Sequence, residues 1–412
     1  MEVTPFDVGV AELLFSAEML ERKLRDAFDR IAPFTIGAEE EFLLVDSVSH
    51  EPLPAAERLL ALSEGDSRFC RELRQSQIES ISPTCVSVAD LQRELASARK
   101  LLAARLEPSG LLVGAGTHPL ATDPGPISDS PRYRAIAMDH PWAASHTLTC
   151  GLHIHVAVGG AERTLAVYNA MRGYLPELIA LAANAPIFRG EISRLATVRP
   201  KLNQFLPRAG IPPAFESWRK LAEFMVWSRD GGAFSDGSYH WWDMRLNTRL
   251  STIEVRAADT QTSVEDAGTV AALVQSLVFD LAARVDDGEL LPTARDERIV
   301  ENAWLATRDG TAGHLIDLET GMRVRTADRL RHLLERLLPA ATALGCEREL
   351  FRIDEMLADS GAARQLQVFL GDGPAALMDY LAEETVRTPM QIELASPVPA
   401  GDWWSSQIAV RA

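Results

Sequence analysis

The stretch Phe34-Thr35-Ile36-Gly37-Ala38-Glu39-Glu40-Glu41-Phe42-Leu43-Leu44-Val45-Asp46 decides the fold class. It is rich in strand-forming residues and contains no proline, so it predicts an extended strand. Because side chains alternate along a strand, Glu39 and Glu41 share one face with Cα atoms about 6–7 Å apart, and Glu40 points to the other face with Phe42. Two carboxylates this close repel each other unless a cation such as Mg²⁺ lies between them. A solvated polar edge strand is the alternative interpretation.

The same alternation recurs in three later segments, each of which puts polar side chains on one face and apolar side chains on the other. The polar residues are Gln75, Gln77 and Glu79 in the first segment, His153 and His155 in the second, and Glu254 and Arg256 in the third. These patterns predict an α+β fold with a single curved, mostly antiparallel sheet and helices packed on its convex face. The concave face would then hold a cleft lined by carboxylates and imidazoles.

The composition is typical of a globular protein with a large core, because 47% of the 412 residues are hydrophobic and 24% are charged. The formal net charge of −17 argues against nucleic acid or an anionic membrane as a partner. The four cysteines lack CxxC spacing, so neither a zinc knuckle nor a disulfide framework is predicted. No signal-peptide pattern and no run of about 18 apolar residues occurs, so we expect a soluble, cytoplasmic protein.

The chain is expected to form one large domain with a short extension at each end. An apolar stripe of helical period over residues 8–30 predicts a helix that packs on the sheet or on a second subunit. Capping boxes at Ser87 and Ser263 predict two further helices. Residues 121–147, rich in Pro, Asp and Ser, predict an ordered excursion that covers the site. The predicted parts are an N-terminal helical extension (1–33), the domain (34–389) and a C-terminal tail (390–412).

Carboxylates from three strands, joined by histidine, favour Mg²⁺ or Mn²⁺ over zinc. Such sites usually share the metal with phosphate oxygens of a substrate, and Arg256 beside Glu254 offers a fork for a phosphate or carboxylate. Trp242 adjoins Asp243 and Arg245 and either floors a nucleotide or amine pocket or packs in the core. The chain has neither a Walker A sequence nor a dinucleotide fingerprint, so metals and arginines would have to hold a nucleotide.

Three segments, residues 37–42, 151–155 and 252–256, resemble the signature strands of the glutamine synthetase and glutamate–cysteine ligase superfamily. More closely, the chain resembles the type 2 glutamate–cysteine ligase, or carboxylate–amine ligase, family over about residues 34–385. Further matching segments are residues 75–79, 116–119, 206–210, 239–243 and 259–262. The resemblance implies that the predicted sheet is a half-barrel and that residues 34–389 form a glutamine synthetase-like ligase domain.

The resemblance implies ATP-dependent amide synthesis, in which the γ-carboxylate of glutamate or a similar acid attacks ATP. The resulting acyl phosphate is then captured by cysteine or another amine. The residues implied to bind divalent metal ions, Mg²⁺ or Mn²⁺, are Glu39, Glu41, Glu79, His153 and Glu254. Those implied to contact ATP or the acyl phosphate are His155, Arg245, Arg256 and Trp242, and Arg199 would hold a substrate carboxylate. The partners would be small-molecule acids and amines, and the chain is expected to form a homo-oligomer, a dimer or larger.

Two segments near the expected substrate site depart from the family's pattern. The chain reads Ile192-Ser193-Arg194-Leu195 where the family usually has an Asp-Thr-Gly-Tyr-like segment, and Arg245-Leu246-Asn247-Thr248 where it usually has Arg-Pro-His-Pro. These departures weaken cysteine as the acceptor more than they weaken ligation. One alternative is a metal-dependent hydrolase that uses the His-x-His strand, although its usual fold repeats strand and helix eight times. The other alternative is a catalytically silent relative that keeps the cleft.

Overall fold

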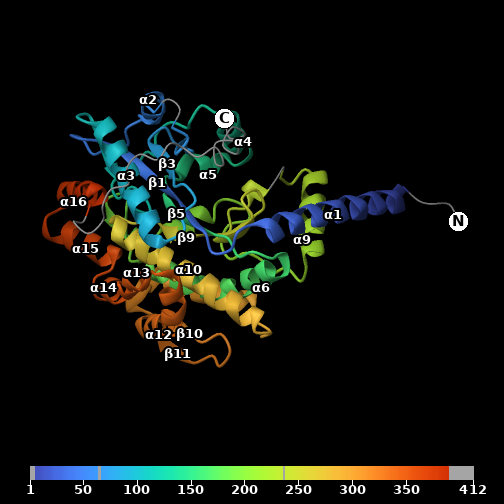
Figure 1. Cartoon of the computed structure of the whole chain (residues 1–412). Coiled ribbons are helices and arrows are strands. Elements are labelled where there is room, and N and C mark those ends of the chain that lie inside the picture. Colours follow the sequence, from blue (N-terminus) through green and yellow to red (C-terminus); the bar gives the residue numbers. More distant parts are fainter. Residues whose placement is uncertain (1–4, 64–65, 235–236, 389–412) are drawn as a thin grey trace.

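The computed structural model describes residues 5–63, 66–234 and 237–388, with side chains of the first helix described from residue 16 onward. Its centre is a seven-stranded sheet (Figure 1) in which every neighbouring pair is antiparallel. The order is β2-β3-β1-β5-β9-β8, and β4 pairs with β1. The strands are β1 (Ile36–Asp46), β2 (Phe69–Arg71), β3 (Gln77–Ile81), β4 (Gly110–Val113), β5 (Gly151–Val156), β8 (Met244–Asn247) and β9 (Thr252–Asp259). The predicted α+β class with a mostly antiparallel sheet is confirmed.

β1 is the central strand of the sheet. One edge pairs with β3, whereas the other edge pairs with β5 along its first half and with β4 along its second half. Nine of its eleven residues are buried, so the interpretation as a solvated edge strand is wrong. The register places Glu41 opposite Glu79 and Glu39 opposite His153. Because paired residues in neighbouring strands point to the same face, these four side chains lie together.

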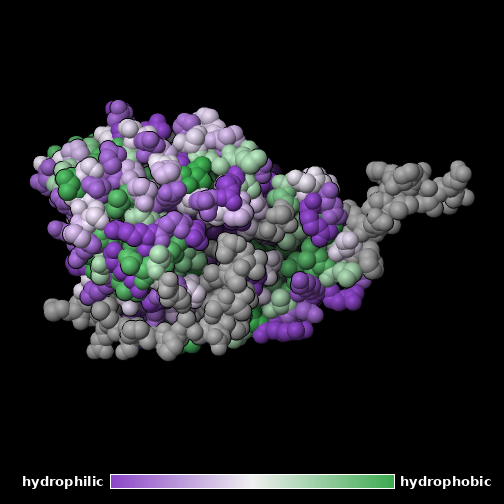
Figure 2. All heavy atoms as spheres, turned by 90° about the horizontal axis from the view of Figure 1, so that it is seen from above, coloured by the Kyte–Doolittle hydropathy of each residue, from purple (hydrophilic) through white to green (hydrophobic). Residues whose placement is uncertain are grey.

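Helices α3 (Val88–Leu106) and α10 (Val264–Asp286) pack against the other face of the sheet, where β1, β5 and β9 present their apolar side chains. Both helices begin as predicted, because the hydroxyl oxygen of Ser87 accepts from the backbone N–H of Asp90, and that of Ser263 from Asp266. Among the described helices, α10 alone is long and apolar enough to cross a membrane, but 72% of its apolar window is buried. It is therefore a helix of the protein core. On the face seen in Figure 2, hydrophilic residues are interspersed with smaller apolar patches.

Glu40 of β1 points into this core and forms a buried ion pair with Arg99 of α3. The two side chains are 0% and 1% exposed, and Arg99 donates to both carboxylate oxygens, from Nε at 3.1 Å and from Nη2 at 2.5 Å. Arg99 also donates to the backbone carbonyl oxygens of Gln261 and Thr262 at 3.0 and 2.8 Å. One guanidinium therefore joins β1, α3 and the segment after β9.

The remaining helices complete the shell around the sheet. α1 (Pro5–Arg30) projects from the body beside α9 (Trp218–Asp230) (Figure 1) and also packs against α6 (Ala161–Met171). Its Leu24 and Phe28 belong to the buried core cluster that also contains Ile36 of β1, so the predicted N-terminal helix is present. The predicted tail over 390–412 lies outside the described residues, and the predicted domain boundaries stay predictions. The other helices are α1 (Pro5–Arg30), α2 (Ala56–Ala61), α4 (Pro131–Asp139), α5 (Pro141–His146), α6 (Ala161–Met171), α7 (Leu175–Leu181), α8 (Arg199–Asn203), α9 (Trp218–Asp230), α11 (Asp296–Asp309), α12 (Thr326–Leu344), α13 (Glu347–Phe351), α14 (Ile353–Ala358), α15 (Gly361–Gly371) and α16 (Pro374–Val386).

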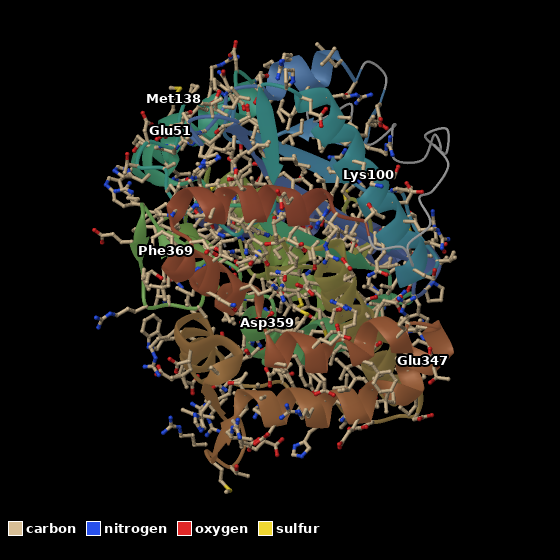
Figure 3. All side chains as sticks on the ribbon, turned by 90° about the vertical axis from the view of Figure 1, so that its left-hand side faces the viewer. Glu51, Lys100, Met138, Glu347, Asp359 and Phe369 are labelled. Atoms are coloured by element: carbon tan, nitrogen blue, oxygen red, sulfur yellow. The ribbon has the colours of Figure 1, made fainter. Side chains whose placement is uncertain are left out.

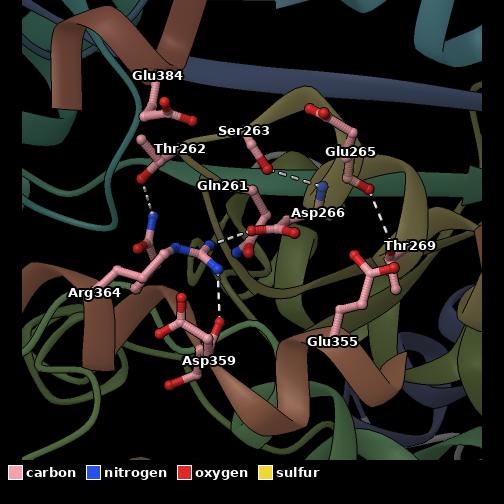
Figure 4. A network of polar contacts seen from close by, with 12 residues as sticks. Gln261, Thr262, Ser263, Glu265, Asp266, Thr269, Glu355, Asp359, Arg364 and Glu384 are labelled. Carbon is pink, nitrogen blue, oxygen red and sulfur yellow. Dashed lines mark hydrogen bonds and ion pairs between the residues drawn. The ribbon is translucent and has the colours of Figure 1, made fainter. Parts of the chain in front are cut away.

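A buried carboxylate anchors the C-terminal helices to the start of α10. Asp266 accepts from Arg352 at 3.2 Å and also from Arg364, whose Nη1 donates to the carbonyl oxygen of Asp359 at 2.6 Å (Figure 4). In the side view of Figure 3, these helices form a stack at one side of the molecule, with Asp359 and Phe369 as markers. The segment that Arg99 contacts is thus continuous with an ion-pair cluster at the N-terminus of α10.

Candidate active site

A cavity of about 960 Å³ opens on the face of the sheet that carries Glu39 and Glu41. Its walls come from β2, from α4 and from residues 237–249, so part of the predicted covering segment 121–147 does line it. The sheet residues that line it are Glu39, Glu41, Phe69, Cys70, Arg71, Gln77, Glu79, His153, Arg245, Leu246, Asn247 and Arg256. Gln75 precedes β3, and its side-chain amide donates instead to the carbonyl oxygen of Ile127 at 3.0 Å.

The carboxylates and imidazoles of the sheet form three overlapping groups. In each group, one potential ligand atom from every residue lies within 4.8 Å of the others. The groups are Glu39 with His155 and Glu254, Glu39 with Glu79 and His153, and Glu41 with Glu72 and Glu79. All five residues predicted as metal ligands are therefore brought together, and His155 joins them although it was predicted to contact ATP.

Glu72 belongs to one of these three ligand groups, although the sequence did not predict it as a ligand. It lies in the connection between β2 and β3, where neither helical nor strand periodicity marks which way a side chain points. Its distance of seven residues from Glu79 is a weak signal in an acidic chain. The tertiary structure alone brings it to Glu41 and Glu79.

Both histidines have the geometry of metal ligands. His153 Nδ1 lies 3.1 Å from Glu39 Oε2, and His155 Nδ1 lies 3.0 Å from the hydroxyl of Thr252. The Nε2 atoms of both rings are buried and have no hydrogen-bond partner among the described residues. Burial, assisted by the charge of Arg256, lowers the pKa of His153 to about 3, so the ring is neutral, as metal coordination requires.

The carboxylates of the ligand group that contains Glu41 and Glu72 repel one another. Burial, and then the charge of Glu72, raises the pKa of Glu41 to about 8, even though Glu41 accepts a hydrogen bond from the backbone N–H of Gly151 at 2.6 Å. A divalent cation among these oxygens would relieve the repulsion. The donor set of several carboxylate oxygens with few imidazoles fits Mg²⁺ or Mn²⁺.

Glu254 joins the metal-ligand groups to two arginines. It accepts from Arg245 Nε at 2.7 Å, from Arg256 Nη1 at 2.5 Å and from the side-chain amide of Asn247 at 2.8 Å. Although burial opposes ionisation, these arginines hold the pKa of Glu254 well below its usual range. The site therefore has positive charge directly beside the carboxylates, as a substrate phosphate would require.

Arg199 reaches the cavity across a bulge in β9. The register between β5 and β9 shifts so that both Arg256 and Ala257 lie opposite His153. The Arg199 guanidinium donates to the carbonyl oxygens of these two residues at 3.1 and 3.4 Å, and it lies 3.8 Å from Asp259. Its Nε is buried and has no hydrogen-bond partner among the described residues, so a donor remains available.

A protein-family model described as glutamate–cysteine ligase family 2 matches residues 35–386. The chain belongs to this family. Its enzyme class, predicted from the sequence, is thereby confirmed as a carboxylate–amine ligase of glutamate–cysteine ligase family 2.

The sequence relatives cover most of the chain. A Rubrobacter xylanophilus protein provisionally named glutamate–cysteine ligase 2-3 is 37% identical over 365 residues, which are 87% of this chain and 99% of that protein. A Mycobacterium tuberculosis protein provisionally named glutamate–cysteine ligase 2 is 33% identical over 363 residues, which are 85% of this chain and 95% of that protein. This family membership rests on nearly the whole described chain.

Solved structures share the fold of this family member at low sequence identity. Glutamate–cysteine ligase from Francisella tularensis, solved in complex with AMP, matches with a TM-score of 0.63 at 10% identity and covers 92% of this chain and 93% of its own. A bifunctional glutathione synthetase from Pasteurella multocida matches with a TM-score of 0.58 at 14% identity, and the match covers 90% of this chain and 54% of that protein. At these identities the likeness concerns the fold alone.

The segments that depart from the family's pattern have structural roles in this chain. Asn247 donates to Glu254, and its side-chain oxygen accepts from the backbone N–H groups of Arg249 and Leu250, which closes the turn after β8. Ser193 donates to the carbonyl oxygen of Pro186, and Arg194 is exposed. The departure at residues 245–248 therefore contacts the ligand groups, whereas the departure at residues 192–195 lies at the surface.

The tryptophans are divided between the core and the cavity. Trp242 is 7% exposed and packs among Phe215, Phe224 and His240, although it also lines the cavity. Its role in nucleotide binding stays a prediction. Trp241 lines the cavity beside Tyr239, and the Arg208 guanidinium lies 5.6 Å from its ring centroid.

Gly151→Ala is expected to reduce ligase activity about 100-fold, because misplacing a catalytic group by about 1 Å can have this effect. A Cβ at Gly151 would overlap Arg199 Nη2 and would lie 2.9 Å from both Arg199 Cζ and His153 Nε2. The guanidinium would have to leave the bulge. Steady-state kinetics with the acid substrate checks this, and Gly371→Ala, where a Cβ meets nothing within 4 Å, is the matched control. Equal activity of the two variants would contradict the assigned position of Arg199.

Proposed function

We propose that this ligase activates an acid with ATP as an acyl phosphate and transfers the acyl group to an amine, with glutamate as the default acid. The observation that carries the proposal is that three overlapping ligand groups and three arginines lie together at one cavity, with His155 and Glu254 just behind the residues that line it. Bringing ATP and a carboxylate together concentrates negative charge. Metals and arginines aimed at the reacting oxygens lower the barrier by neutralising that charge.

Each residue has a role in this proposal. Glu39, Glu41, Glu72, Glu79, His153, His155 and Glu254 would hold Mg²⁺ or Mn²⁺ ions, which would neutralise the phosphates. Arg245 and Arg256, fixed by their bonds to Glu254, would contact the phosphates of ATP and then of the acyl phosphate. Arg199, with its unpartnered Nε, would hold the carboxylate of the acid. Because these arginines are already oriented by protein acceptors, little reorganisation accompanies binding.

The size of the cavity fits a ligand as large as a nucleotide. Typical sites for a single small molecule measure about 300–1,000 Å³, and this cavity is near the upper end at about 960 Å³. The hydrolase interpretation gains no support, because the two histidines of the His-x-His strand fall in different ligand groups. Assembly as a homo-oligomer stays a prediction.

The function is tested by trapping the acyl phosphate with hydroxylamine. The purified protein, MgATP and hydroxylamine are incubated with a panel of acids that includes L-glutamate, and both ADP and hydroxamate are measured. We expect one acid to yield equal amounts of ADP and hydroxamate, and excess EDTA to abolish both. Failure of every acid to release ADP, or release of ADP that EDTA does not affect, would refute the proposal.

A further inference from the structure

Asp243 is a carboxylate of the cavity that the roles above do not use. It lies just before β8, lines the cavity together with Arg199 and Arg256, and is partly buried. Its backbone is held on both sides, because its N–H donates to the carbonyl oxygen of Gly210 at 2.8 Å and its carbonyl oxygen accepts from the N–H of Arg256 at 2.7 Å. The backbone at Asp243 is therefore held in place by β9 and by the segment that contains Gly210.

Within the described part of the chain, the Asp243 carboxylate forms neither a hydrogen bond nor an ion pair. Three positively charged side chains lower the pKa of this carboxylate, but each of them donates its hydrogen bonds to other groups. Arg256 is bonded to Glu254, and Arg199 to the bulge carbonyls. Lys201 donates to Gln204 at 3.2 Å. A partly buried carboxylate without a partner, at the wall of a cavity, is suited to meeting a cationic group of a ligand.

We propose that Asp243 forms the acceptor subsite of this ligase, binding the ammonium group of the amine substrate and taking one of its protons. This inference rests on the proposed function. The neutral nitrogen then attacks the carbonyl carbon of the acyl phosphate, so that a C–N bond forms and the C–O bond to phosphate breaks. The leaving phosphate takes the electron pair and the second proton, departing as HPO₄²⁻.

The surroundings suit Asp243 to this proton transfer at neutral pH. Burial raises the pKa of Asp243 to about 6, although Arg199 and Lys201 of α8 and Arg256 of β9 oppose the rise. A base is most effective when its pKa lies near the working pH, since it is then ionised but still basic. We therefore expect amide formation to decline as the pH falls through about 6.

The test compares nucleophiles that do and do not need deprotonation. Asp243→Asn keeps the shape of the side chain but removes the base. With the acid that gives hydroxamate in the wild type, we expect amide formation from L-cysteine, methylamine or ammonium ion to fall about 100- to 10,000-fold. Hydroxamate formation should stay close to that of the wild type, because hydroxylamine is already neutral. Asp243→Glu should recover part of the amide formation, and Asp372→Asn, at an exposed helix end, is the matched control.

The other outcomes separate this inference from the proposed function. Equal loss of amide and hydroxamate in Asp243→Asn would place the residue in activation of the acid or in folding, and would overturn the acceptor role. Unchanged amide formation would overturn it too, as would a wild type that forms hydroxamate but no amide from the ammonium-type amines. A wild type that forms no hydroxamate from any acid would instead refute the proposed function itself.

Discussion

Glu254→Gln is expected to lower ATP turnover at least about 1,000-fold, through loss of charge stabilisation at the reacting phosphates. Glu254 is fully buried, belongs to a metal-ligand group and pairs with both Arg245 and Arg256. A neutral amide at this position would leave two guanidinium groups without their carboxylate. We therefore also expect a loss of unfolding free energy of about 3–5 kcal/mol. ADP release and urea unfolding measure the two effects.

A double variant distinguishes the catalytic effect from the structural one. Glu254→Gln combined with Arg245→Met removes one of the uncompensated charges, so part of the stability should return while turnover stays low. From the sequence alone we would expect Glu254→Ala to abolish ATP turnover and to leave the folded protein soluble. The structure changes that expectation for stability, because the ion pairs of Glu254 with Arg245 and Arg256 are buried. Near-normal turnover in either variant would refute the metal assignment of Glu254.

Arg99→Met is expected to lower the free energy of unfolding by about 3–5 kcal/mol, because it leaves the Glu40 carboxylate buried without a counter-ion. The carbonyl oxygens of Gln261 and Thr262 also lose their donor. Since β1 carries Glu39 and Glu41 on its opposite face, ligase activity should fall as well, even though Arg99 lies away from the cavity. Chemical denaturation and steady-state kinetics are the measurements.

Two matched variants control this experiment. Lys100→Met removes a positive charge from the next residue of α3, which lies at the surface (Figure 3), and should change stability by less than about 0.5 kcal/mol. The pair Glu40→Leu with Arg99→Met removes both buried charges and should recover most of the lost stability. If Arg99→Met and Lys100→Met had the same small effect, the ion pair would not stabilise the fold.

The sequence predicted the features that depend on local alternation. In β5 and β9 the polar residues alternate with apolar ones, and in β1 Glu39 and Glu41 are two residues apart, so the face of Glu39, Glu41, His153 and Glu254 follows from the two-residue period alone. The helix starts at Ser87 and Ser263 were also predicted, because a capping side chain bonds to a backbone group only three residues away. These short-range relations need no knowledge of tertiary contacts.

Features that depend on distant contacts were missed. The carboxylate of Glu40 was assigned to the apolar face, but nothing local connects it with Arg99, 59 residues later in the chain. A local signal was missed as well, because helices α4 and α5 were expected only as an ordered excursion, although both begin at a proline, Pro131 and Pro141, which is a recognised helix-start signal. The unpaired state of Asp243 depends on which partners Arg199 and Arg256 choose, and the sequence carries no trace of that choice.

The opposed faces of β1 constrain how this protein can evolve. Inserting or deleting one residue ahead of Glu39 would rotate the rest of the strand by half a turn, sending Glu40 toward the cavity and its two neighbours into the apolar interior. The cavity face and the apolar core would both be disrupted at once, so no single-residue insertion or deletion there is tolerable. Substitutions that change substrate preference are therefore expected in the turns that border the cavity, such as the one closed by Asn247. The length of β1 is expected to stay constant.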